Sequence, residues 1–201
     1  MKPDWCVEEF LKELDRLNLT DNTLVILTSD NGPVLDDGYQ DQAEELVGSH
    51  KPAGPYRGWK TMRYAGGTCI PFIVRWPGVV EPGVSDAFVC QMDLLASLAS
   101  LVGQSYPDRT DSQNTLQTFL GKNRKGRNEL VIEGMLDYAY RQGDWVMIPP
   151  YPGENRTYEL YNIRKDPEQK NDLSESEPKV LRRMMMRFEE LKRETGKKTN
   201  F

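Results

Sequence analysis

The fold class of this chain can be inferred from the stretch Thr23-Leu-Val-Ile-Leu-Thr-Ser-Asp-Asn-Gly32. Its first five residues show no alternation between apolar and polar side chains, which is typical of a strand buried on both faces of a helix-covered sheet. A helical pattern precedes it, with Val7, Leu11 and Leu14 on one face. A helix that leads directly into such a strand is half of an α/β unit. The sequence therefore predicts an α/β fold.

Three further patterns predict the rest of the architecture. An apolar run at Ile70–Trp76 favours another strand, and Met92–Val102 favours a helix that stops before Gly103. Short runs separated by glycine-bearing turns then indicate an antiparallel meander. Its expected strands are Glu129–Gly134, Tyr138–Arg141, Trp145–Ile148 and Thr157–Tyr161. We expect a partial mixed sheet flanked by helices, followed by a small antiparallel sheet with a C-terminal helix.

The predicted domain organisation has two parts. Residues 104–115 are polar and resemble a linker, and the texture of the chain changes after them. We expect an α/β part over residues 1–120 and an α+β subdomain over residues 121–201. The C-terminal helix should run from about residue 178 to residue 195, with Gly196 just past its end.

Composition excludes several classes of protein. The 201 residues carry 26 Lys and Arg against 31 Asp and Glu, for a formal net charge of −5. This balance argues against a dedicated nucleic-acid binder, and no apolar run reaches the roughly 18 residues of a membrane span. Three widely spaced cysteines do not form a disulfide framework. A single histidine, His50, excludes a histidine-rich zinc site built from this chain alone.

The end of the first predicted strand carries two hard oxygen donors. In open α/β sheets, ligands bind beyond the carboxyl ends of the strands. Asp30 and Asn31 stand at that position, and a carboxylate beside an amide oxygen suits Ca²⁺ or Mg²⁺. A plain Asx turn that ends the strand explains the same residues without a ligand.

Asp30 and Asn31 form a corner at the end of this strand, and charge is unevenly distributed along the segment that follows it. Its acids fall early and its cations late, so that the second half is basic. The late residues are His50, Lys51, Arg57, Lys60 and Arg63. A basic half-loop beside a metal corner would bind an oxyanion, with a lysine as a point charge and an arginine as a bidentate donor. A solvated basic surface loop is the alternative.

Read in order, several stretches resemble the sulfatases of the alkaline phosphatase superfamily. The first resembles the motif that carries calcium ligands in these enzymes, and the second resembles their lysine-bearing loop. The last ones are similar to their C-terminal subdomain. The stretches are Thr23–Gly32, His50–Lys60, Gly66-Gly67, Pro71–Gly78, Glu159–Pro167 and Asn171–Leu173.

The resemblance implies a role for each matching residue. Asp30 and Asn31 would be calcium ligands, and the ion would act as a Lewis acid on a sulfate oxygen. Lys60 would contact the sulfate and stabilise charge as the ester breaks. The substrate subsite would be lined by His50, Lys51 and Arg57. Sulfatases hydrolyse sulfate esters, so an aryl sulfate or a sulfated carbohydrate is the implied substrate.

The motifs that the family carries in the N-terminal part of its catalytic domain are not found before the Asp-Asn pair of this sequence. Sulfatases carry a formylglycine made from Cys or Ser in a C/S-x-P-x-R motif, well before the Asp-Asn pair. Cys6 and Cys90 do not begin this motif, and Cys69 has the proline without the arginine, so Cys69 is expected to be a packing residue. The usual N-terminal pair of calcium aspartates is also absent, which leaves the calcium site incomplete.

The resemblance therefore implies a C-terminal portion of a sulfatase without its nucleophile. Residues 1–120 would be the C-terminal part of the catalytic domain, and residues 121–201 the C-terminal subdomain. We expect this chain to need the missing N-terminal half for activity. Ala65 and Cys69 stand where the family tends to have an acid and an arginine. Sulfatases of this kind are usually periplasmic or secreted, although the chain itself carries no signal of export.

Two other functions fit the same residues. One is a phosphoesterase or phosphonate hydrolase of the same superfamily, although one histidine disfavours its two-zinc form. The other is a non-catalytic module that binds sulfated glycans through the loop from His50 to Arg63. In that module, Tyr56 and Trp59 would stack on sugar rings.

Overall fold

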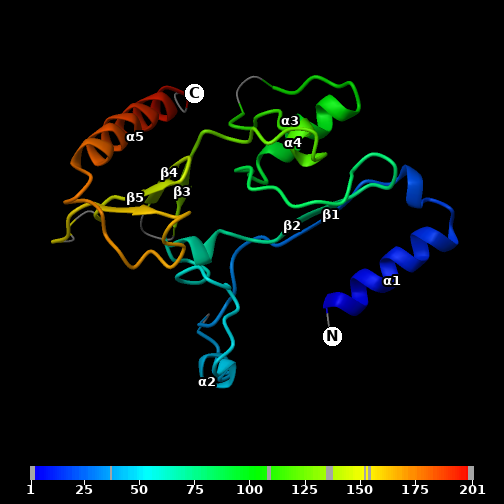
Figure 1. Ribbon diagram of the computed structural model, residues 1–201, viewed down its shortest axis with the longest axis horizontal. Coiled ribbons are helices and arrows are strands. Elements are labelled where there is room, and N and C mark those ends of the chain that lie inside the picture. The colour runs from blue at the N-terminus through cyan, green and yellow to red at the C-terminus, as the bar shows by residue number, and fades with distance from the viewer. Residues whose placement is uncertain are drawn as a thin grey trace. The chain divides into compact units, whose positions relative to one another are not determined.

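A computed structural model describes residues 3–36, 38–107, 110–134, 138–151, 153 and 155–198 (Figure 1). The chain forms two compact units, and each of them combines segments that are distant in the sequence. Unit 1 consists of Met1–Thr28 and Pro71–Arg127, and unit 2 consists of Ser29–Ile70 and Asn128–Phe201. Compact units need not coincide with domains, so the predicted boundary at residue 120 stays a prediction.

Unit 1 is built from helices around a two-stranded sheet. Its elements are α1 (Pro3–Arg16), the 3₁₀ helix η1 (Thr20–Asn22), β1 (Val25–Thr28), β2 (Phe72–Arg75), α3 (Asp93–Leu101) and α4 (Leu116–Phe119). Strands β1 and β2 pair antiparallel, from Val25 opposite Arg75 to Thr28 opposite Phe72. The Phe72 ring stacks on Phe119 with centroids 5.1 Å apart, which ties β2 to α4. Both strands and the α3 helix confirm the sequence predictions.

The expected burial of the first strand is wrong for this sheet. Leu27 is 40% exposed, and its partner Ile73 is 56% exposed. Each side chain lies on a face that no described part of unit 1 covers completely. A strand with apolar residues on both faces is suited to a sheet with more neighbours and two covered faces, and the two-stranded sheet described here supplies neither.

A buried ion pair organises the second half of unit 1. Asp93 at the start of α3 is fully buried, and Arg127 donates to its two carboxylate oxygens over 2.8 and 2.7 Å. Gln113 N also donates to Asp93 over 2.8 Å, and Thr115 N donates to Ser97 Oγ over 2.9 Å. The stretch expected to be a linker is therefore tied to α3 at residues 113–115, because backbone donors find buried acceptors there.

Unit 2 contains the predicted meander and the C-terminal helix. Its elements are α2 (Ala43–Val47), the 3₁₀ helix η2 (Ala65–Gly67), β3 (Glu129–Glu133), β4 (Tyr138–Gln142), β5 (Trp145–Ile148), β6 (Glu159–Asn162) and α5 (Pro178–Lys198). The four strands pair antiparallel in chain order, as predicted. Helix α5 continues through Gly196, so this glycine does not end the helix as expected.

The sheet of unit 2 separates two apolar clusters. One cluster contains Ala139, Val146, Ile148 and Tyr161 and packs on the loop residues Tyr64 and Ala65. The other lies under α5 and contains Tyr140, Met147, Leu160, Met184 and Phe188. This division follows from strand geometry, because successive side chains point to opposite faces of a sheet.

Together the units give the predicted class, an α/β protein with an antiparallel C-terminal sheet and a C-terminal helix. Both sheets of the described residues are antiparallel. Of the mixed sheet that was expected, the described residues therefore contain only an antiparallel pair of strands. Within the same residues, no helix combines the length and the apolar composition that crossing a bilayer requires.

Candidate functional site

The corner after β1 carries the two predicted metal ligands. Ser29 Oγ donates to the Asn31 carbonyl oxygen over 3.0 Å, and Asn31 Nδ2 donates to Gly32 O over 2.8 Å. These bonds hold a tight turn of the kind that Asx residues favour. Asp30 is exposed. In the described part of the chain, neither the Asp30 carboxylate nor the Asn31 amide oxygen is paired with a cation.

The loop with Lys60 returns beside this corner. Lys60 N donates to Pro33 O over 2.9 Å, and Gly32 N donates to Gly67 O over 2.8 Å. These backbone bonds join two segments that are distant in the sequence. They place Lys60, whose side chain is exposed, next to the chain that leaves Asp30 and Asn31. The structure thus brings the backbone of the lysine candidate beside the turn that carries the two metal-ligand candidates.

Close backbone contacts explain the glycines of this region. A β-carbon at Gly32 would meet the Gly66 carbonyl oxygen at 1.8 Å. A β-carbon at Gly66 would meet the carbonyl oxygens of Gly58 and Arg57 at 2.2 and 2.6 Å. Only glycine allows backbones to approach so closely. The Gly66-Gly67 pair is therefore part of the scaffold that holds the corner and the lysine loop together.

Arg57 is held by contacts within unit 2. Its guanidinium carbon lies 3.7 Å from the centroid of the Tyr64 ring, within cation–π range. Its Nη1 donates to the Gln169 carbonyl oxygen over 3.0 Å. Because these contacts fix the side chain, Arg57 anchors the loop to the segment after β6. Its use as a substrate contact stays a prediction.

Gln169 is the residue that ties the loop to the C-terminal part of unit 2. Its side chain is fully buried, and its Oε1 accepts a hydrogen bond from Ala65 N over 2.8 Å. Its own backbone N donates to Asp166 O over 3.1 Å. Ala65 stands where the family tends to have an acid, and here its backbone N–H is satisfied by a side chain from the segment after β6.

A cavity of about 330 Å³ lies beside the basic half-loop, and it contains only some of the predicted residues. Lys51 and Arg57 line it, whereas His50 and Lys60 do not. Lys51 Nζ lies 3.6 Å from Glu168 Oε1 at the cavity wall. The remaining lining residues are Pro33, Leu35, Pro52–Tyr56, Gly58, Glu168 and Lys170. The Lys60 side chain is therefore not part of the cavity lining.

A carboxylate between two tyrosines lies under the loop. Glu159 Oε2 accepts hydrogen bonds from Tyr64 Oη over 3.2 Å and from Tyr161 Oη over 2.7 Å. Burial is the main cause that raises the pKa of both phenols, and the Glu159 charge raises each further. Both tyrosines therefore stay protonated and act as donors that hold the loop to β6.

The corner has the donor chemistry of a calcium site but too few ligands for a complete one. Ca²⁺ takes 6–8 oxygen atoms, and Asp30 and Asn31 supply two side chains. Among the described residues there is no group of three or more His, Cys, Asp or Glu side chains able to hold a metal ion. The residues present therefore fit a part of a calcium site.

The predicted packing role of Cys69 is confirmed. The side chain packs against the cluster that contains Tyr64 and Tyr161. Burial raises the pKa of its thiol, which disfavours the reactive thiolate. Cys69 is therefore a partly buried packing residue.

An α/β fold with oxygen donors beside a lysine loop defines a candidate oxyanion site, and comparison with known proteins gives its family. The model of the family described as Sulfatase matches residues 2–104. An N-acetylgalactosamine-6-O-sulfatase of Bacteroides thetaiotaomicron is 42% identical over 204 residues, which cover 94% of this chain and 40% of that protein. The steryl-sulfatase of Rattus norvegicus is 36% identical over 132 residues, which cover 64% and 22%.

A solved structure agrees with these sequences. It comes from work on the metabolism of multiple glycosaminoglycans by Bacteroides thetaiotaomicron, and it aligns with a TM-score of 0.86 at 42% identity. The alignment covers 94% of this chain and 42% of that one. The chain belongs to the sulfatase family. It spans about two fifths of the length of the N-acetylgalactosamine-6-O-sulfatase that it matches.

The sequence contains one serine match to the formylglycine pattern. Ser105-Tyr-Pro-Asp-Arg109 fits S-x-P-x-R. It follows Lys60 in the chain, whereas the family motif precedes the Asp-Asn pair, and a pattern with three fixed positions also arises by chance. Ser105 is exposed after α3 in unit 1, and Asp108 and Arg109 lie outside the described residues. The position of this match in the chain therefore differs from that of the family motif.

Sequence reasoning also missed Gln169, Glu168 and Lys170. All three lie in the stretch that follows β6, which resembles the C-terminal subdomain of the family, but no local pattern distinguishes them from other polar residues. Gln169 has a positive φ of 47°, a conformation that is uncommon outside glycine and that its buried contacts maintain.

Proposed function

We propose that this chain carries the lysine-bearing part of a sulfatase active site and acts in the hydrolysis of sulfate esters on carbohydrate. The observation that supports this most strongly is the Lys60–Pro33 backbone bond, which sets Lys60 beside the Asp30–Asn31 corner. Substrate specificity is proposed from the relative, whose name identifies N-acetylgalactosamine 6-O-sulfate as its substrate. We expect the same sugar sulfate to be the first substrate to test.

Lys60 would act through its charge. Hydrolysis breaks the bond between sulfur and the ester oxygen and develops negative charge on the oxygens around sulfur. A fixed ammonium group stabilises that charge more in the transition state than in the ground state. Asp30 and Asn31 would supply some of the ligands of a calcium ion, which would provide Lewis-acid chemistry when bound. His50, Lys51 and Arg57 would contact the sugar.

The nucleophile would come from outside this chain. We propose that a segment with the C/S-x-P-x-R motif completes the site, as the missing N-terminal half of the catalytic domain. We also propose export to the periplasm or the exterior, where sulfated polysaccharides occur.

The test is complementation. The chain is co-expressed with a motif-bearing segment of a related sulfatase, and sulfate release from N-acetylgalactosamine 6-O-sulfate is measured with calcium present. We expect Lys60→Ala to lower kcat by roughly 10²- to 10³-fold, the loss typical of an oxyanion-stabilising group. Lys60→Arg should retain part of the rate. Lys122→Ala, at an exposed lysine of unit 1, and Ser105→Ala should leave the rate unchanged.

Three results would contradict the proposal. One is no sulfate release from any sulfated sugar or aryl sulfate by a complex in which both parts are folded. A second is an unchanged rate for Lys60→Ala. The third is hydrolysis of phosphate esters with zinc and no action on sulfate esters, which would favour a phosphoesterase of the same superfamily.

A further inference from the structure

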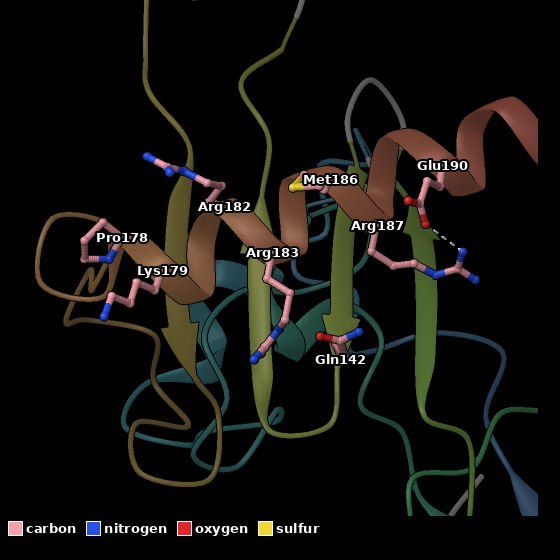
Figure 2. A pocket seen from close by; sticks show the side chains of 8 residues that line it. All are labelled: Gln142, Pro178, Lys179, Arg182, Arg183, Met186, Arg187 and Glu190. Carbon is pink, nitrogen blue, oxygen red and sulfur yellow. Dashed lines mark hydrogen bonds and ion pairs between the residues drawn. The ribbon is translucent and has the colours of Figure 1, made fainter.

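A groove of about 680 Å³ lies along one side of α5 (Figure 2), and no residue assigned above to the sulfate site lines it. Most of its lining comes from successive turns of α5, and one residue comes from the end of β4. The lining residues are Gln142, Pro178, Lys179, Arg182, Arg183, Met186, Arg187 and Glu190. None of them lines the cavity beside Lys51. The groove is therefore a separate feature of unit 2.

The charge of this groove is opposite to that of the chain. It presents four cations and one carboxylate, although the chain as a whole has a net charge of −5. The cations lie three, one and four residues apart along α5, which repeats them on one side of the helix over more than two turns. Lys179, Arg182 and Arg183 are exposed, and none forms an ion pair with the described residues. Three positive groups therefore face solvent in a row.

The fourth cation has a different role. Arg187 Nη2 lies 2.7 Å from Glu129 Oε1 on β3, and its Nη1 lies 3.2 Å from Glu190 (Figure 2) and 3.3 Å from Glu194. These bonds hold α5 on the sheet at one end of the groove. Between the cations, Met186 is 62% exposed and the Gln142 amide provides a neutral hydrogen-bonding group. The surface thus combines three cations that have no ion-pair partner among the described residues with a neutral and an apolar group.

We infer that this face of α5 binds a sulfated polysaccharide chain. Repeated sulfates along such a chain complement a row of cations, and the amide and the methionine suit the sugar between them. The lining contains no aromatic side chain, whereas single-stranded nucleic acids are usually held by stacking on aromatic residues. The choice of polysaccharide rests on the proposed function. The groove would hold a long substrate near the enzyme and would take no part in bond cleavage.

The experiment measures binding of chondroitin sulfate to the protein carrying Lys60→Ala, so that turnover does not interfere. The test variant combines Lys179→Gln, Arg182→Gln and Arg183→Gln. We expect its affinity to fall roughly tenfold or more, because each cation close to a polyanion contributes to binding. The dependence of affinity on salt should also become weaker. The charge-preserving variant Lys179→Arg, Arg182→Lys, Arg183→Lys should bind like the parent.

A matched control removes the same charge elsewhere. Lys122→Gln, Arg124→Gln and Lys125→Gln change three exposed cations in a turn of unit 1, and this variant should keep its affinity. Equal affinity of the α5 variant and the parent would overturn the inference, as would equal losses in both triple variants. Tighter binding of single-stranded DNA than of chondroitin sulfate at the same salt would also overturn it.

A second measurement separates this inference from the proposed function. In the complemented enzyme, the α5 variant should hydrolyse the monosaccharide sulfate at the parent rate, because the groove contacts only a longer chain. Loss of binding with unchanged monosaccharide turnover supports the groove. Absence of turnover in the parent contradicts the sulfatase proposal. The binding measurement still tests, independently of turnover, whether the groove binds the polysaccharide.

Discussion

Unit 2 buries a core between its sheet and α5, whereas unit 1 leaves more of its large apolar side chains exposed. In unit 2, Met147, Leu160 and Met184 are completely buried between the meander and α5. In unit 1, Phe10 and Leu95 are each more than half exposed on their helices. Consecutive hairpins and a following helix can close a core locally. A two-stranded sheet with short helices cannot do so, and large exposed apolar surfaces mark contacts with other protein.

The comparison teaches that the two units differ in what they need for stability. Unit 2 has the core expected of a part that folds from its own residues. Unit 1 relies on a buried ion pair and on the stacking of Phe72 on Phe119, and we expect its apolar surface to be covered by further protein. Substitutions in the two units should therefore have different costs.

The largest effect should come from the ion pair of unit 1. Arg127→Ala leaves the Asp93 carboxylate buried and without its cation, which should cost about 3–5 kcal/mol of unit 1 stability. Amide hydrogen exchange in α3 measures it. Arg124→Ala, at an exposed residue nearby, should change the free energy of opening obtained from exchange by less than about 0.5 kcal/mol. A small effect of Arg127→Ala would show that the ion pair does not hold unit 1 together.

A truncation in the core of unit 2 should follow closely. Leu160→Ala removes a completely buried side chain next to Met184, and should cost about 2–5 kcal/mol. The matched change Leu95→Ala in unit 1 removes a half-exposed side chain, and should cost about 1 kcal/mol or less. Exchange rates in β5 and α3 report the two units separately. Equal costs for the two leucines would contradict the difference in core packing between the two units.

The glycine scaffold gives an intermediate effect. In Gly66→Ala the new β-carbon meets two backbone carbonyl oxygens of the lysine loop, so the loop must shift at a cost of about 1–3 kcal/mol. Gly83 in unit 1 has no atom within 4 Å of the same position, so Gly83→Ala should be tolerated. Thermal unfolding of both variants measures the difference. An unchanged Gly66→Ala would contradict the close packing of the corner against the loop.

The smallest effect concerns pH. The Arg187 guanidinium, through hydrogen bonds to Glu129, lowers the pKa of that carboxyl below its usual value of 4.5. The stabilisation is fully present above that usual value, and it is lost as the pH falls through the lowered pKa. We expect it to contribute about 1 kcal/mol to unit 2. Urea unfolding between pH 6 and roughly pH 3 measures it, and Arg187→Gln should remove this part of the pH dependence.

The sequence was a good guide where side chains repeat and a poor one where single polar residues meet. The antiparallel meander and α5 could be predicted because alternation and helical spacing are local signals. Asp30, Asn31 and Lys60 could be selected from residue type and family resemblance, and their roles stay predictions. The bonds from Gln169 to Ala65 and Arg57 could not be predicted, since nothing in the local sequence marks a buried glutamine. The same holds for Asp93 and Arg127.

Gln169 also has a consequence for the order of folding. It fixes the conformation of the lysine loop through residues more than a hundred positions earlier in the chain. Contacts of such sequence separation form slowly, because the intervening chain must first be ordered. The loop therefore reaches its final shape only after β6 is in place. In a refolding experiment, secondary structure should return first and the geometry around Lys60 last, so that the candidate site is among the final parts of the protein to be built.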